Sequence, residues 1–169
     1  MGKGEEIDET KLYEMAKKAT SEGALFASLY LDIHGADEKK LQNVAVELVN
    51  RMMKEQGVLF VFGKIEEPIL QEGVYSTLVE VKAIVADINS LATLTYVYTP
   101  VSVDLIMPDE VKLTSSQVGS LMVYISNQSF NWKKIYIERM RTKEEAEAFA
   151  KEVQAREQLG KKLLEGEGK

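Results

Sequence analysis

The strongest constraint on the fold is an amphipathic helix pattern that lies between two short apolar runs. Apolar residues at positions 41, 44, 45, 48, 49 and 52 recur at the three-and-four spacing of a helix with one buried face. Asp37 is placed to cap this helix and Gly57 to end it. Residues 24–33 and 58–65 are short and apolar, which is typical of buried strands. The sequence therefore predicts a β-α-β unit.

A second unit of the same kind follows. Residues 75–86 and 101–107 are predicted strands, the latter closed by Pro108, and residues 66–73 are predicted to be a connection. Between them, Asp87 begins a segment that is typical of a helix start. Residues 93–99 are rich in β-branched and aromatic side chains, which favour a strand. We predict a helix over 88–98 and keep the strand as the alternative.

The two ends of the chain carry helix signals. A helix is expected to begin at Asp8 and to end at Gly23. Capping boxes starting at Thr114 and at Thr142 predict one helix over about 115–128 and a last helix near the C-terminus. The alternating residues 134–140 predict a fifth strand.

Together these elements predict an α+β fold with a ferredoxin-like (split βαβ) core. The sheet is expected to be mainly antiparallel, with about five strands and with peripheral N- and C-terminal helices. The predicted organisation is an N-terminal helical extension over 1–22, a single core domain over 23–140, and a charged C-terminal helix with a frayed tail over 141–169.

Cysteine is absent and His34 is the one histidine, which narrows the possible chemistry. Thiol nucleophiles, cysteine-ligated metals and disulfides are excluded, and so is a cage of several histidines within one chain. Any Ser/His/Asp triad would have to use His34. An enzyme is therefore less expected than a binding protein, and no cofactor is predicted.

The net charge of −6 and the pI of about 5.0 disfavour general binding to nucleic acid. No apolar run approaches the length that spans a bilayer, and the acidic N-terminus is unlike a signal peptide. We expect a cytoplasmic protein without membrane contact.

The strongest local cluster of chemistry-bearing residues lies at the end of the first predicted strand. Asp32 and His34 share one face of that strand, and Asp37 follows at the helix start, so the three could hold a divalent metal ion. Such a site would suit a metal-assisted hydrolase or isomerase. In the alternative interpretation, Asp37 only caps the helix and His34 makes local hydrogen bonds.

The same turn offers a second kind of site. Gly35, Ala36, Asp37 and Glu38 stand where backbone N–H groups at a helix N-terminus can approach a small anionic ligand. With this Gly-Ala-Asp turn, residues 24–107 resemble an ACT-type regulatory domain in their order of elements. That resemblance implies a small-ligand site at the turn.

Trp132, Phe149 and Val153 are the candidate interaction surface, because the terminal helices have narrow apolar stripes that must dock onto something. Phe130 and Trp132 beside two lysines could instead form a stacking platform for nucleic acid. Balanced charge in the last helix and the lack of cysteine are consistent with a heat-stable source.

We therefore expect a non-enzymatic binding or regulatory module that forms a homo-oligomer and holds a small ligand at a subunit boundary. The alternatives are a structural or adaptor protein that binds a partner protein without a ligand, and the metal-assisted enzyme centred on Asp32, His34 and Asp37.

Overall fold

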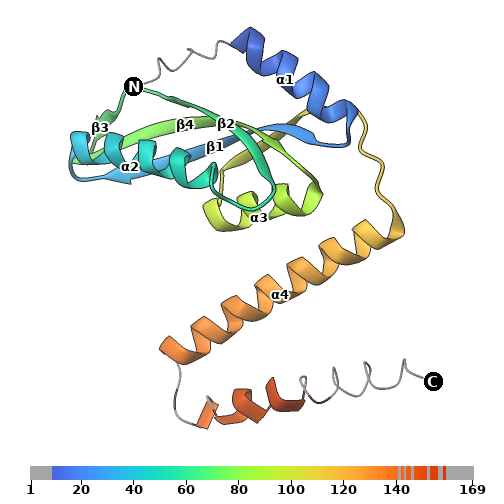
Figure 1. The fold of residues 1–169 in the computed structure, drawn as a ribbon. Coiled ribbons are helices and arrows are strands. Elements are labelled where there is room, and N and C mark those ends of the chain that lie inside the picture. The colour runs from blue at the N-terminus through green and yellow to red at the C-terminus, as the bar shows by residue number, and fades with distance from the viewer. Residues whose placement is uncertain are drawn as a thin grey trace. The chain divides into compact units, whose positions relative to one another are not determined.

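The computed structural model describes residues 9–140, 142, 144–145, 147–151, 153–155 and 158 (Figure 1). The expected helix start at Asp8 and the expected frayed tail lie outside these residues. The chain divides into two compact units, Met1–Leu121 and Met122–Lys169. The division between the two units falls inside a helix.

Apart from one short additional strand, the elements of the first unit follow the predicted order. They are α1 (Glu9–Ser21), β1 (Leu25–Gly35), α2 (Glu38–Met52), β2 (Val58–Ile65), β3 (Ile69–Gln71), β4 (Val74–Val85), α3 (Ile88–Tyr98) and β5 (Ser102–Met107). The strand order is β2-β4-β1-β5, all neighbours are antiparallel, and β3 pairs with β4. This order, with α2 and α3 on one face, confirms the ferredoxin-like α+β core.

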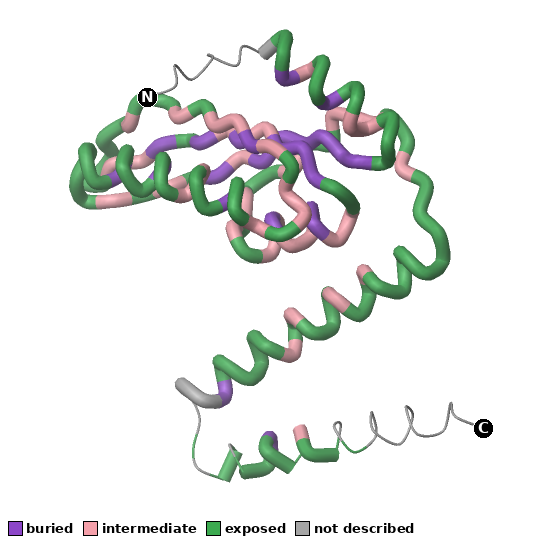
Figure 2. Tube along the Cα trace, viewed as in Figure 1, coloured by how far each residue is buried: buried purple, intermediate pink, exposed green. Residues whose placement is uncertain are grey.

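The sheet has two differently covered faces, and its central strands are buried between them (Figure 2). On the helix face, α2 and α3 pack on alternate residues of β1 and β4, such as Leu29 and Val81. On the opposite side, which we call the α1 face, Leu12 and Ala16 of α1 cover Phe26 and Ile84. Burial against both faces explains why residues 25–29 of β1 and 83–85 of β4 are buried without interruption.

Side-chain caps fix where the two covering helices begin. Asp37 Oδ1 accepts a hydrogen bond from the Lys40 N–H at 2.9 Å, and Asp87 Oδ1 accepts one from the Ser90 N–H at 2.8 Å. The helix predicted over 88–98 is confirmed. Its β-branched residues are tolerated because Leu91 and Leu94 are buried in the core, so packing outweighs strand propensity.

Two predictions about strands were wrong. Residues 134–140 belong to α4 (Ser115–Met140), which extends the helix predicted over 115–128. The fifth strand is β3, inside the segment predicted to be a connection. Ile135 and Ile137 suggested alternation, but Ile137 is buried while Ile135 and Tyr136 are exposed, which is a helical pattern.

Capping also holds beyond the core. The Thr114 N–H donates to Gln117 Oε1 and the Gln117 N–H donates to Thr114 Oγ1, as the capping box predicted. The second box is confirmed by a bond of 3.2 Å from the Thr142 N–H to Glu145 Oε2. Among the described residues, no helix is both long and apolar enough to cross a membrane.

Candidate functional site

Three side chains on the α1 face form a continuous chain of polar contacts. Asp32 and His34 are two residues apart on β1, so they share a face, and Ser76 of β4 is the direct cross-strand partner of His34. His34 Nδ1 lies 2.7 Å from Ser76 Oγ, and His34 Nε2 lies 3.1 Å from Asp32 Oδ2. The side chains of His34 and Asp32 are 56% and 45% exposed, so this cluster meets solvent.

The roles of the two ring nitrogens follow from the partners. An ionised Asp32 carboxylate can only accept a hydrogen bond, so His34 Nε2 carries the proton in the neutral ring. Nδ1 is then free to accept from the Ser76 hydroxyl. The order is hydroxyl, imidazole, carboxylate, which is the arrangement that activates a serine in hydrolases.

Asp37 does not join this group. Its carboxylate is occupied in capping α2 at Lys40, as the structural interpretation of the sequence anticipated. Among the residues that the structure describes, no three histidine, aspartate or glutamate side chains lie close enough together to hold a metal ion. The structure thus brings Asp32 and His34 together, and adds Ser76 where the sequence had suggested Asp37.

The turn from Gly35 to Glu38 closes β1 onto α2. Ala36, Asp37 and Glu38 are exposed, and Gly35 lies against Leu41, whose Cδ1 would be 3.4 Å from an added Cβ. One N–H at the start of α2 is taken by Asp37 itself. The carboxylates of Asp37 and Glu38 oppose an anion at this point.

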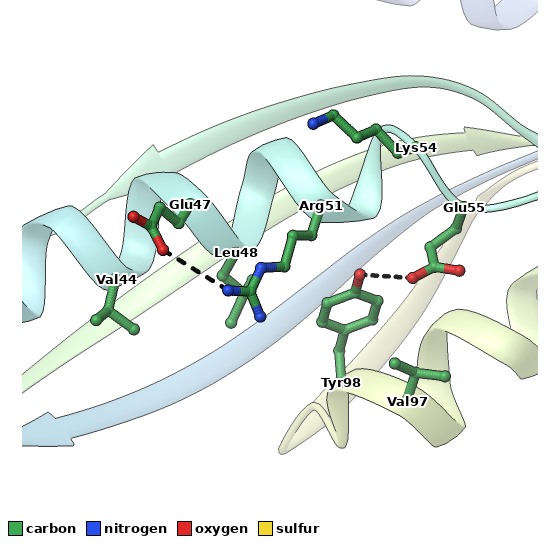
Figure 3. A pocket seen from close by; sticks show the side chains of 8 residues that line it. All are labelled: Val44, Glu47, Leu48, Arg51, Lys54, Glu55, Val97 and Tyr98. Atoms are coloured by element: carbon green, nitrogen blue, oxygen red, sulfur yellow. Dashed lines mark hydrogen bonds and ion pairs between the residues drawn. The ribbon is translucent and has the colours of Figure 1, made fainter.

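A groove lies between α2 and α3 on the helix face, with a volume of about 600 Å³ (Figure 3). Val44, Leu48 and Val97 give it an apolar lining. The Tyr98 hydroxyl donates to Glu55 Oε1 at 2.8 Å, and the nearby Arg51 pairs with Glu47 at 3.7 Å (Figure 3).

Tyr98 lines this groove, and its phenol has a raised pKa. Partial burial disfavours the phenolate, and the hydrogen bond and negative charge of Glu55 add to the effect, so the pKa of Tyr98 rises to about 12. From the sequence alone, Tyr98 is interpreted as a core or interface aromatic residue rather than as part of a ligand site.

In the second unit, the three residues of the predicted interaction surface have different environments. Phe149 is buried and its ring lies 5.6 Å from that of Phe130, with Lys133 placed over it. Val153 is partly buried. Trp132 remains 58% exposed. Phe130 thus packs inside this unit, while Trp132 lies on a surface.

Trp132 belongs to a regular stripe along α4. Met122, Ile125, Ser129, Trp132 and Tyr136 follow one another at spacings of three and four residues, and all are exposed. We call this set the α4 stripe. Such spacing places them on one side of the helix in the heptad pattern by which helices pair. The stripe has apolar or aromatic side chains at four of its five positions.

The helix around the stripe is also free of charge over most of its length. Residues 115–132 contain no Asp, Glu, Lys or Arg, in a chain that is 28% charged. Depletion of charge at an exposed surface is the composition expected of the centre of a protein–protein interface.

Comparison with protein-family models matches residues 27–158 to the MJ0538 family. The matched range includes the whole of α4 and every strand of the sheet except the first two residues of β1. No curated protein and no solved structure gives a significant match to the chain.

Proposed function

The chain belongs to the MJ0538 family, and we propose that it is a binding module that self-associates through the α4 stripe. The observation that carries this proposal is the exposed heptad stripe, whose first four positions lie in the charge-free residues 115–132. Exposed large apolar side chains in a regular array are costly in water and mark a surface that is covered by a partner.

A second copy of this chain is the occupant we propose. A symmetric pair brings each surface close to its own equivalent, so a charged surface would repel itself. The chain carries a net charge of −6, yet the α4 stripe itself has no charged residue. It can therefore meet its copy without like-charge repulsion, whereas it offers no charge pattern to select a different partner.

Disulfide trapping tests this proposal cleanly, because the chain has no native cysteine. Ser129 is the central position of the α4 stripe, so it faces its equivalent in either a parallel or an antiparallel pair. We expect Ser129→Cys to form a covalent dimer under mild oxidation. Asn127→Cys, which is exposed on the same helix but outside the stripe, is the matched control and should stay monomeric on a denaturing gel.

Two results would contradict the proposal. If folded Ser129→Cys does not cross-link, the two copies of position 129 do not come together and the α4 stripe is not the dimer interface. If Asn127→Cys cross-links equally fast, the disulfides arise from random collision. A stripe that captures another protein instead of its own copy would support the adaptor alternative and would leave Ser129→Cys monomeric.

The small-ligand part of the function rests on the groove between α2 and α3. Its apolar lining and the Arg51 guanidinium suit a compact apolar molecule with one carboxylate. Benzoate is a suitable probe, followed by NMR of backbone amides. We expect signals near Val97 and Tyr98 to shift, and the shifts to weaken in Arg51→Gln. Shifts elsewhere in the chain, or shifts that are unchanged in Arg51→Gln, would contradict the proposal that this groove binds a small carboxylate ligand.

A further inference from the structure

The Asp32–His34–Ser76 cluster is bordered by exposed apolar side chains. These side chains are not part of the α4 stripe, so the proposed self-association does not account for them. Directly opposed residues in an antiparallel pair lie on the same face, so Ile69, paired with Ser76, shares its face. Val74 and Leu78 are two residues to either side of Ser76 on β4 and also share it. These three side chains are 55%, 44% and 42% exposed, respectively.

Ser76 therefore lies between these exposed apolar side chains and the polar side chains of His34 and Gln71. A cavity of about 650 Å³ opens beside it, lined by His34, Gln71, Glu72, Val74 and Ser76. Gln71 contributes the uncharged amide of this lining, and its N–H groups can donate to an oxygen that becomes negative during a reaction.

The reactive side chains are held by sheet geometry. Asp32, His34 and Ser76 lie on two central strands whose pairing runs without a break from Leu25↔Val85 to Gly35↔Tyr75. Side chains on paired strands are positioned more rigidly than those on loops, as an acid–base relay requires. Contacts of 2.7 Å and 3.1 Å place the imidazole within proton-transfer distance of Ser76 and within hydrogen-bond distance of Asp32.

We propose that Ser76 is the nucleophile of an ester-hydrolysing site on the α1 face, with substrates that carry an apolar acyl group. This activity is separate from the self-association proposed above. His34 is the general base, Asp32 holds the imidazole with its proton on Nε2, and the patch of Ile69, Val74 and Leu78 binds the acyl chain.

The reaction balances with water as the one co-reactant. Ser76 Oγ attacks the ester carbonyl carbon and gives its proton to His34 Nδ1. The bond between that carbon and the alkoxy oxygen breaks, and the leaving alcohol takes the proton from His34. Water, deprotonated by His34, then attacks the acyl-serine ester. The carboxylic acid leaves, and Ser76 regains its proton from His34.

Covalent labelling of the full-length protein with an alkyl fluorophosphonate tests the nucleophile directly. In this probe reaction the Ser76 Oγ–P bond forms, the P–F bond breaks, fluoride leaves, and the serine proton passes to His34. We expect intact-mass spectrometry to show one phosphonyl group per chain, and peptide mapping to place it on Ser76.

Three variants make the labelling result specific. Ser76→Ala should lose the label, and His34→Gln should slow labelling by about 10²-fold, the smaller contribution typical of a general base. Ser102→Ala is the matched control, since Ser102 is exposed on β5 and is paired with Tyr30 of β1, and it should label like the wild type. Hydrolysis of p-nitrophenyl butyrate should follow the same ranking.

The proposal is overturned if the folded wild-type chain takes up no label, or if Ser76→Ala labels at the wild-type rate. An unchanged labelling rate in His34→Gln, with circular dichroism showing a folded protein, would equally remove His34 as the base. Because labelling is measured per chain, failure here leaves the Ser129→Cys cross-linking result unaffected, and the two proposals fail separately.

Discussion

At the scale of single residues, the structure shows how distant positions become neighbours. The sequence alone predicts that Asp32 and His34 lie close together, because residues two positions apart on one strand share a face. The contact between Ser76 and His34 could not be predicted in this way. Ser76 lies 42 positions from His34 and is brought next to it only by the pairing register of β1 and β4. Register depends on the whole sheet, so no local pattern around Ser76 signals the contact.

Tyr98 gives a prediction about pH. Its pKa is raised to about 12 in the folded chain, against an ordinary value of 10.0, so between these values the unfolded chain loses a proton that the folded chain keeps. The stabilisation from Tyr98 is complete below about pH 10 and is lost as the pH rises to about 12.

We therefore expect the stability advantage of the wild type over Tyr98→Phe to shrink across that range. At neutral pH the variant should be less stable by about 1 kcal/mol, for the lost hydrogen bond to Glu55. Urea unfolding at a series of pH values measures the difference, and Tyr75→Phe on β4 serves as the control. A difference that stays constant from pH 9 to 12 would contradict the account.

At the scale of elements, local sequence was a good guide where a cap and a periodic pattern agreed. The bounds of β2 and α3 matched the prediction because turn residues or a capping Asp enclose each of them. The strand predicted over residues 134–140 was wrong because a short alternating run is compatible with both strand and helix. In the structure these residues continue the long helix α4. The three-residue β3 is too short to leave a pattern of its own.

The packing of α2 on β2 requires a residue without a side chain at Gly63. A Cβ added there would lie 2.7 Å from Cγ2 and 3.0 Å from Cγ1 of Val49 on α2. We predict that Gly63→Ala destabilises the fold by about 1–3 kcal/mol, the usual cost of overpacking. Thermal unfolding followed by circular dichroism measures this loss.

Gly119 is the matched control for that substitution. It lies inside α4, and a Cβ added there meets no atom within 4 Å. Gly119→Ala should therefore raise stability by up to about 1 kcal/mol, because alanine is the better helix former. Equal effects of the two substitutions would show that α2 does not press on β2 at Gly63.

At the scale of the whole molecule, the chain has a ferredoxin-like core and a long helix that carries an exposed stripe. The core was predictable because its two β-α-β units each carry a complete set of local signals. The stripe on α4 was only partly predictable. Trp132 was singled out in the sequence, whereas Phe149 was chosen with it although it is buried against Phe130.

Charge placed in the α4 stripe should dissociate the pair. Ile125→Lys removes a side chain whose burial stabilises association by about 1.5–3 kcal/mol, so the dissociation constant should rise by about 10- to 100-fold. Val123→Lys makes the same change at an exposed position next to the stripe. It should leave the dissociation constant within a few-fold of the wild-type value.

Self-association through the α4 stripe can be measured by sedimentation velocity of the full-length wild type, Ile125→Lys and Val123→Lys over a range of concentrations. We expect a dimer for the wild type and for Val123→Lys, and the 19.0 kDa monomer for Ile125→Lys at the same concentration. A wild type that remains monomeric throughout, or an Ile125→Lys variant that associates as strongly as the wild type, would contradict the proposed self-association.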